Sequence, residues 1–320
     1  MGAENLSRLV AARRTELAYY SPYYFLRQLA SERQQALFGT GVAAAWGQDA
    51  GTELVRSSAG PAEVAWLLNQ LPWDSEYFGT PMYRLFTGLF DGAATPAQLT
   101  QAATDLRAQL AARHEAFYAF SVVPAEDIHL LQGLTGAGWQ LVETRLTYYR
   151  DQLPAFDYSR YPVRPATEGE AGRVGQVAAT ARNVYDRFHA DPWFGEARAD
   201  AYLARYAENT VAAGLADVVL VPNQPDLSVD SFLAISDLAH DAQALDTALS
   251  RVLLTAVGPA NRGWHVKLMA ETVHRAKELG HEAVLMTTQA TNHAVFRSCE
   301  KLGFQLGATS HVLACNGLMV

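Results

Sequence analysis

The succession helix, strand, helix, glycine, strand occurs twice in this chain, and it restricts the fold more than any other feature of the sequence. In both copies, apolar residues at helical spacing alternate with short β-rich segments. The first copy is predicted over 96–112, 116–123, 127–136 and 139–149. The second is predicted over 264–279, 283–288 and 292–302. Such alternation predicts a mixed α/β fold.

The two copies also align in sequence. Placing Gly138 over Gly303, an offset of 303 − 138 = 165, gives further identities: Gln140 with Gln305, Leu141 with Leu306 and Thr144 with Thr309. This is the pattern of an internal repeat. The alternative is that any helix, glycine, aromatic and strand unit produces the same matches.

Composition excludes several classes of protein. With 320 residues, 49% of them hydrophobic, the chain can bury more than one core, so two domains are expected. A net charge of -8 argues against nucleic-acid binding, and no run of about 18 apolar residues indicates a membrane span. Cys299 and Cys315 lack the spacing of a disulfide framework or metal site. We therefore expect a cytoplasmic protein without a metal.

Three segments are expected along the chain: a helical N-terminal extension over 1–60, a smaller α/β domain over 61–155, and a larger one over 160–320. The extension has apolar residues at helical spacing, followed by the aromatic cluster 19–25. This cluster is expected to dock the first helix onto the protein, with a homodimer contact as the alternative. The segment 71–79 is strand-like and turn-like, and its aromatic residues are expected to pack.

The second α/β domain is expected to begin with a strand near 161–165. Its further elements are helices over 168–183 and 197–213 and strands over 218–221, 231–235 and 249–257. The last of these strands ends at Gly258-Pro259, and a helix follows from about Gly263. A strand that leads into a helix N-terminus directs free backbone N–H groups and the positive end of the helix dipole to one place, so an anion such as pyrophosphate is expected there.

These blocks resemble the GNAT acyltransferases. That family combines a strand, an Arg/Gln-x-x-Gly-x-Gly/Ala loop that holds the CoA pyrophosphate, and a later Asn-x-x-Ala-x-x-x-Tyr-Glu-x-x-Gly-Phe helix. Here Arg262 opens the loop, and the later helix matches at Asn292, Glu300, Gly303 and Phe304. Segments 71–79, 187–192 and 288–292 look like those of bacterial TDP-fucosamine acetyltransferase relatives, which acetylate a nucleotide-linked amino sugar.

The resemblance implies a GNAT-type mixed sheet flanked by helices, preceded by a smaller GNAT-like half-domain. It also implies N-acetyl transfer from acetyl-CoA to a small-molecule amine, by direct attack of the amine on the thioester. The residues implied to bind acetyl-CoA are Leu254, Ala256, Val257, Arg262, Gly263, Trp264, His265, Val266, Lys267 and Asn292.

Three residues depart from the family pattern. His265 and Lys267 stand at the two small positions of the pyrophosphate loop, where their side chains crowd a backbone cradle. Lys267 has the alternative role of supplying charge to the phosphates. Cys299 stands where the family has the tyrosine that protonates the leaving thiolate, so it is a candidate acid, or a small packed residue.

The remaining candidates lie in the loop that the resemblance places beside the acceptor. His189 and Asp191 are candidate bases, and Arg187 and Phe188 are candidate substrate contacts, with an ordinary surface loop as the alternative for each. His293 and His311 are expected to be structural. The altered loop leaves a second function open, a degenerate GNAT scaffold that serves as a binding or assembly module.

Overall fold

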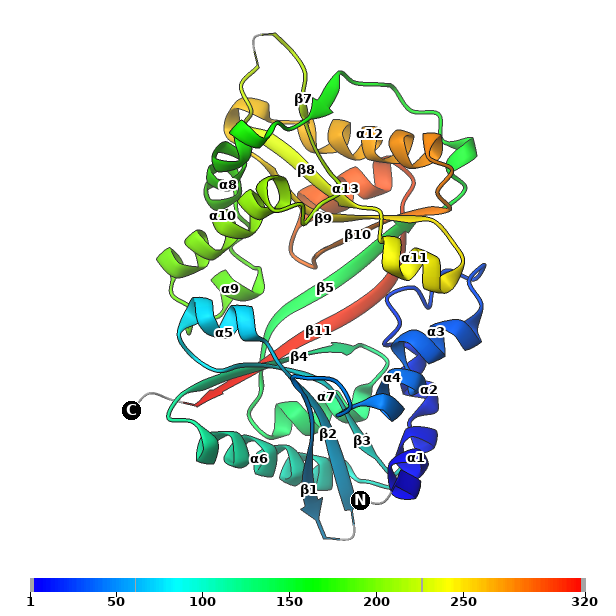
Figure 1. Cartoon of the computed structure of the whole chain (residues 1–320), viewed down its shortest axis with the longest axis vertical. Coiled ribbons are helices and arrows are strands. Elements are labelled where there is room, and N and C mark those ends of the chain that lie inside the picture. The colour runs from blue at the N-terminus through cyan, green and yellow to red at the C-terminus, as the bar shows by residue number, and fades with distance from the viewer. Residues whose placement is uncertain (1–2, 61, 226, 318–320) are drawn as a thin grey trace. The chain divides into compact units, whose positions relative to one another are not determined.

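A computed structural model describes residues 3–60, 62–225 and 227–317, and the chain forms two compact units (Figure 1). Unit 1 contains residues up to Thr144 together with the segment from Thr309, and unit 2 contains Arg145–Ala308. In the part of the chain that the structure describes, no helix is long and apolar enough to cross a membrane.

Unit 1 begins with four helices and continues with strands and helices in alternation. Its helices are α1 (Ala3–Ala12), α2 (Arg14–Ala18), α3 (Ser31–Phe38), α4 (Thr40–Ala45), α5 (Pro72–Phe78), α6 (Pro96–Arg113) and α7 (Ile128–Gly136). Its strands are β1 (Thr52–Ala59), β2 (Ala62–Gln70), β3 (Met82–Phe90), β4 (Phe117–Pro124), the first residues of β5 (Gln140–Arg150) and most of β11 (Gln305–Gly317).

Unit 2 has the same kinds of element. Its helices are η1 (Leu153–Ala155), η2 (Glu168–Glu170), α8 (Ala171–Thr180), α9 (Arg187–Ala190), α10 (Glu196–Ala212), α11 (Ala239–Leu245), η3 (Pro259–Asn261), α12 (Trp264–Glu278) and α13 (His293–Lys301). Its strands are the end of β5, β6 (Val163–Pro165), β7 (Val218–Pro222), β8 (Ser231–Ser236), β9 (Leu249–Val257) and β10 (Ala283–Gln289).

The strands of the two units follow the same plan. In unit 1 the order is β1-β2-β3-β4-β11, and in unit 2 it is β7-β8-β9-β10-β5, with β6 added beyond β7. In each unit the only parallel pair among the described strands is the third with the fourth, β3 with β4 and β9 with β10. The predicted α/β class, a mixed sheet flanked by helices, is confirmed.

The last strand of each unit comes from a distant part of the chain. Helix α7 of unit 1 leads into β5, which pairs with β10 of unit 2, and helix α13 of unit 2 leads into β11, which pairs with β4 of unit 1. The strand registers of the two pairs also correspond. In unit 2 Val284 lies opposite Arg150, and the residues at the equivalent repeat positions in unit 1, Ala119 and Cys315, also lie opposite each other. The two copies therefore exchange their final strands.

The repeat predicted from the sequence is confirmed by the capping of its helices. Asp127 accepts a hydrogen bond from the Leu130 N–H at the start of α7, and Asn292 accepts one from the Val295 N–H at the start of α13, 165 residues later. Gly138 and Gly303 follow these helices with φ of 83° and 71°, a left-handed conformation that glycine adopts without steric cost.

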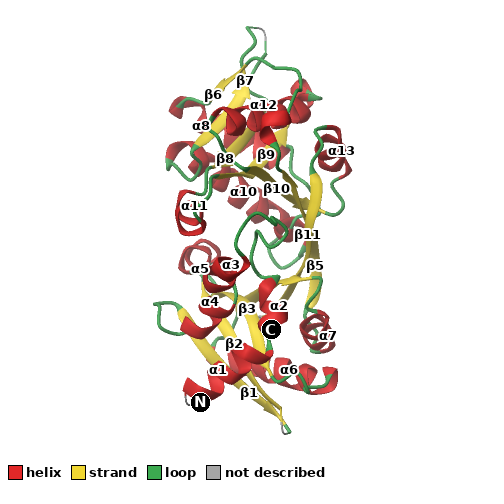
Figure 2. Cartoon of the chain, turned by 90° about the vertical axis from the view of Figure 1, so that its right-hand side faces the viewer, coloured by secondary structure: helices red, strands yellow, loops and turns green. Residues whose placement is uncertain are grey.

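Alternation along β8 divides unit 2 into layers (Figure 2). Phe232 and Ala234 pack in a core with residues of α8 and α10, whereas Leu233 and Ile235 pack in a core with residues of α12 and α13. Successive strand residues point to opposite faces, so this sheet needs apolar cover on both sides.

In unit 1 a different set of helices covers the two faces of the sheet. Along β2, Trp66 and Leu68 join a core with residues of α6 and α7, and Ala65 and Leu67 join a core with residues of α1, α2 and α4. The N-terminal helices thus cover the unit 1 face that α8 and α10 cover in unit 2.

Two local predictions are wrong. Segment 71–79 forms helix α5, since Pro72 occupies a first-turn position where its missing N–H is not needed and Gly79 ends the helix at φ 64°. The helical extension predicted to about residue 60 ends at Ala45, and Thr52–Ala59 form β1 because pairing with β2 determines their conformation. The predicted elements over 96–149 and 161–302 are found within a few residues, although η2 opens the helix expected from 168 and α9 lies in the expected acceptor loop.

Candidate functional site

The parallel strands β9 and β10 separate partway along their length. Their pairing runs from Leu249 with Ala283 to Val252 with Met286, and β9 continues to Val257 and β10 to Gln289 beyond the last pair. We call the opening between Leu253–Val257 and Thr287–Gln289 the unit 2 fork. Backbone groups on its two edges have no strand partner across the opening, so they are available to an extended ligand.

A β-bulge lies where this fork begins. Ala234 of β8 is opposite Leu254, and the next residue, Ile235, is opposite Val252, so Leu253 is the extra residue. A bulge bends the strand and redirects its backbone groups. Of the predicted cofactor-binding residues on β9, Leu254 and Val257 are half-buried and Ala256 is 8% exposed.

The chain leaves β9 through a loop held by one carboxylate. Asp230 accepts a hydrogen bond from the Ala260 N–H at 2.9 Å, and its backbone carbonyl accepts one from the Gly258 N–H. A Cβ at Gly258 would stand 2.3 Å from an oxygen of Asp230, so only glycine fits. Arg173 pairs with the same carboxylate, and these contacts fix the loop that leads to α12.

The start of α12 is open to a ligand. Gly263 is the N-cap residue with φ of 90°, and no side chain caps this end. No heavy atom lies within 4 Å of the place where a Cβ of Gly263 would be. The first N–H groups of the helix therefore have no side-chain partner, Arg262 beside them is exposed, and the binding of an anion here stays a prediction.

The side chains of the first helical turn lie as follows. Trp264 is 4% exposed in the core of unit 2, and Val266 packs against the same core. The Lys267 ammonium lies 4.5 Å from the ring centre of Trp264 and 5.5 Å from that of Tyr161, which are cation–π contacts. Lys267 is thus held on aromatic rings rather than within a backbone cradle.

His265 is the unusual member of this turn. Both of its ring nitrogens are buried, with no hydrogen-bond partner among the described residues. Burial lowers the pKa of His265 to about 4, so the imidazole is neutral at pH 7.

Comparison of the whole fold with solved structures gives clear similarity at low sequence identity. A GCN5-related N-acetyltransferase from Sphaerobacter thermophilus is 11% identical, with a TM-score of 0.52 over 96% of this chain and 91% of that one. The chain has the GNAT fold. A functionally unknown conserved protein from Staphylococcus epidermidis ATCC 12228 is 12% identical, with a TM-score of 0.51 over 78% of this chain and 90% of that one. Neither a protein-family model nor a curated protein sequence matches the chain.

Within this GNAT fold, Cys299 is a core residue. Its side chain is fully buried in the core formed with α12, and burial, followed by the charge of Glu300, raises the pKa of the thiol to about 12. Its repeat partner, 165 residues earlier, is Leu134, which is also fully buried. The thiol is protonated at neutral pH but closed off from solvent, and its role as an acid stays a prediction.

The thiols allow a direct test of this burial. Burial also raises the pKa of Cys315 to about 12, so both cysteines should react with iodoacetamide at pH 8 roughly 1,000-fold more slowly in the folded protein than in urea, because the thiolate is the nucleophile. Mass spectrometry of the alkylated peptides measures both rates. Fast labelling of Cys299 in the folded state would show that its thiol reaches solvent.

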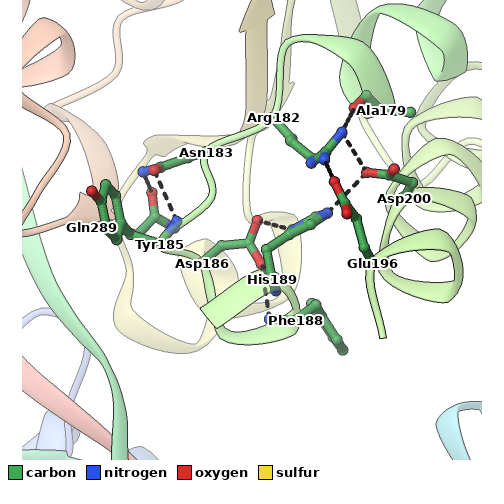
Figure 3. A network of polar contacts seen from close by, with 10 residues as sticks. All are labelled: Ala179, Arg182, Asn183, Tyr185, Asp186, Phe188, His189, Glu196, Asp200 and Gln289. Carbon is green, nitrogen blue, oxygen red and sulfur yellow. Dashed lines mark hydrogen bonds and ion pairs between the residues drawn. The ribbon is translucent and has the colours of Figure 1, made fainter. Parts of the chain in front are cut away.

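His189 lies in a network of carboxylates (Figure 3). Its Nδ1 is 2.7 Å from Asp186 Oδ2, its Nε2 is 3.0 Å from Asp200 Oδ1, and its side chain is 4% exposed. Arg182 pairs with Asp200 and with Glu196. Both ring nitrogens lie within hydrogen-bond distance of a carboxylate, so in this arrangement neither faces an incoming amine. A role for His189 as base stays a prediction that requires the network to open.

The other predicted acceptor residues are also packed. Asp191 is 5% exposed and accepts a hydrogen bond from the Trp193 N–H at 3.0 Å. Arg187 lies over the ring of Phe188, 4.3 Å from its centre, and the Phe188 ring centre is 4.3 Å from that of Tyr202. Asp191, Arg187 and Phe188 thus hold the short helix α9 in place, and their contact with a substrate stays a prediction.

The segment before α9 lies beside the end of β10. Asn183 donates a hydrogen bond to the side chain of Gln289 at 2.8 Å, and Figure 3 shows this pair on the far side of Asp186 from Arg182. Val184 and Tyr185, next in the chain, are more than half exposed. The residue that precedes the predicted acceptor loop therefore contacts one strand of the fork. Within the described residues, no group of three or more His, Cys, Asp or Glu side chains forms a metal site.

Unit 1 has a corresponding fork, and its own N-terminal helices close it. Strands β3 and β4 pair only from Met82 to Leu85 of β3. Beyond this point Arg13 donates to the Gly88 carbonyl at 3.3 Å and pairs with Asp127, which follows β4. Tyr20 donates to the same carboxylate and accepts from Thr87. Nothing in the sequence around Arg13 marks this role.

The helix after β3 is also closed to a ligand. Thr95 accepts a hydrogen bond from the Gln98 N–H, the Gln98 side chain accepts one from the Thr95 N–H, and Pro96 at the first position has no N–H to offer. This capping box blocks the end of α6 that corresponds to the open start of α12. The two units share a fold, but of these two corresponding helix starts only that of α12 has no side-chain cap.

Proposed function

We propose that unit 2 transfers an acetyl group from acetyl-CoA to the primary amine of a small molecule. The observation that carries this proposal is the combination, in one unit, of the fork between β9 and β10 with the uncapped start of α12. A helix N-terminus suits the pyrophosphate, and unpaired strand edges suit an extended pantetheine arm. The GNAT fold supports the same reading.

In the proposed reaction the neutral amine attacks the thioester carbonyl directly, so no covalent enzyme intermediate is needed. The edge of β9 over Leu254–Val257 would hold the donor, and a backbone N–H of this edge would polarise the carbonyl. The space at Gly263 and the free N–H groups of α12 would receive the pyrophosphate, and the unpartnered nitrogens of His265 lie in the same turn.

The acceptor we propose is the amino group of a nucleotide-linked sugar, and its support is the sequence resemblance over 71–79, 187–192 and 288–292. Arg187 is the proposed contact for a substrate phosphate. A panel of primary amines, with and without a nucleotide, tests this choice, and a preference for simple polyamines would contradict it.

Titration calorimetry with acetyl-CoA tests the proposal itself. We expect about one site per chain, because Arg13 and Tyr20 close the fork of unit 1. Acetyl-CoA at 100 times its Kd should stabilise the protein by about 2.7 kcal/mol. The absence of both heat and thermal shift at millimolar acetyl-CoA would refute the proposed function.

A substitution at the helix start localises the site. Gly263→Ala should weaken acetyl-CoA binding at least 10-fold, because it places a methyl group where the phosphates would approach the backbone and forces a non-glycine residue to φ 90°. Gly195→Ala is the matched control, since Gly195 is also an uncapped N-cap residue with positive φ and open space around its Cβ position. Both variants should lose similar stability, and only the first should lose affinity in calorimetry. Equal affinities would place the pyrophosphate elsewhere.

A further inference from the structure

The ammonium of Lys267 lies at the start of α12 and has no acidic partner there. Side chains of a helix tilt toward its N-terminus, and this ammonium lies 4.5 Å from the ring centre of Trp264, the first residue of the helix. It also lies 5.5 Å from the ring centre of Tyr161. The first turn of α12 contains no acidic residue, and no ion pair of Lys267 is found among the described residues. A positive charge is therefore uncompensated beside the positive end of the helix dipole.

Glu271 is the carboxylate that a lysine at position 267 would be expected to pair with, because residues four apart on a helix are neighbours. Both oxygens of Glu271 instead bind the segment that precedes β6. One accepts a hydrogen bond from the Tyr161 N–H, and the other accepts one from Arg160 at 3.0 Å. The charge of Glu271 is thus compensated by Arg160, and the ring of Tyr161 lies beside the ammonium that Glu271 leaves unpaired.

The position of this ammonium indicates which phosphate it suits. The free N–H groups of α12 point along the helix axis, where the pyrophosphate is proposed to bind, whereas the ammonium lies to one side of the axis, beside two rings. In CoA the 3′-phosphate is one ribose away from the pyrophosphate, and as a monoester it carries a charge of about −1.5 to −2 at pH 7. A compact ammonium on a long side chain suits such a group.

We propose that Lys267 binds the 3′-phosphate of the CoA donor and that Tyr161 positions its ammonium for this contact, an inference that rests on the proposed function of unit 2. Unit 2 then selects intact CoA against donors that lack this phosphate, such as 3′-dephospho-CoA or a phosphopantetheine attached to a protein. The family pattern has a small residue at position 267, so this selectivity belongs to the present chain.

Titration calorimetry with acetyl-CoA and with its 3′-dephospho analogue tests the proposal. The wild-type protein should bind acetyl-CoA roughly 10-fold more tightly, the effect of one charged contact. Lys267→Met keeps an unbranched side chain beside the rings, and it should weaken acetyl-CoA binding roughly 10-fold while the Kd for the analogue stays within about twofold of wild type. Lys277→Met is the control, since it removes the same charge near the other end of α12, where the ammonium bonds to the Phe156 carbonyl, and it should leave the preference unchanged.

The ring of Tyr161 gives a second measurement. Tyr161→Leu keeps the N–H that bonds to Glu271 and removes the ring, so it should reduce the preference for acetyl-CoA roughly threefold, whereas Tyr161→Phe should retain the preference because the contact needs only the face of the ring.

Two results would overturn the proposal while the proposed function stands. Equal weakening of both ligands by Lys267→Met would place the ammonium at the pyrophosphate, and equal affinities of the wild-type protein for both ligands would show that no residue distinguishes the 3′-phosphate. If the wild-type protein binds neither ligand, the proposed function fails as well.

Discussion

Replacing Arg13 with methionine is expected to destabilise unit 1 by about 3–5 kcal/mol, because the substitution leaves the Asp127 carboxylate buried without its cation. The Arg13 side chain is 2% exposed and that of Asp127 is fully buried. Arg13 also bonds to the Gly88 carbonyl and lies 4.2 Å from the ring centre of Phe90. Methionine fills similar volume, so most of the loss would come from the unpaired charge.

Urea unfolding combined with hydrogen exchange measures this effect in each unit. Amides of β3 and β4 should lose protection, and amides of β9 and β10 should keep theirs. Arg8→Ala is the control, since the Arg8 pair with Asp91 is more than half exposed on both sides and should contribute about 0–1 kcal/mol. A loss for Arg13→Met as small as that for Arg8→Ala would contradict the role assigned to the buried pair.

The Arg13→Met variant also tests whether closure of the unit 1 fork affects the proposed binding of acetyl-CoA in unit 2. Arg13 closes the fork of unit 1, and the proposed acetyl-CoA site lies in unit 2, so the affinity for acetyl-CoA should not change while the protein remains folded. A second binding site in calorimetry of Arg13→Met would show that the N-terminal helices occupy a fork that is otherwise able to bind the cofactor.

The sequence predicted the elements whose ends carry local signals. Thr95, Asp127 and Asn292 begin helices by capping backbone N–H groups, and Gly138 and Gly303 end them, so these bounds follow from a few neighbouring residues. The start of α12 after Gly263 was also predicted from neighbouring residues. The prediction for segment 71–79 was wrong because its aromatic residues are typical of a strand, although Pro72 at the first turn favours a helix.

The remaining features depend on contacts between residues far apart in sequence. The exchange of β5 and β11 could not be predicted from the sequence, because both strands have the same local residue pattern. That pattern is compatible with pairing to either β4 or β10. Arg13 looks like one more polar residue on a helix, and only its contact with Asp127, 114 residues away, shows that it is buried.

Asp127 and Asn292 provide the second large prediction, since they are repeat partners with the same local role. Each accepts a hydrogen bond at the start of its helix, at 3.4 Å from the Leu130 N–H and 3.3 Å from the Val295 N–H. Asn292→Ala should therefore cost about 1 kcal/mol, the usual loss of an N-cap. Asp127→Ala should cost about 3–5 kcal/mol, because it also leaves Arg13 buried without its carboxylate.

Urea unfolding of the two variants, with hydrogen exchange to assign each loss to its unit, measures the difference. Similar losses would mean that Asp127 acts only as a cap and that Arg13 finds another partner. A larger loss for Asp127→Ala, together with a double variant Arg13→Met/Asp127→Ala that loses less than the sum of the single variants, would show direct coupling. Such coupling would mean that unit 1 gains stability from the contact that closes its fork.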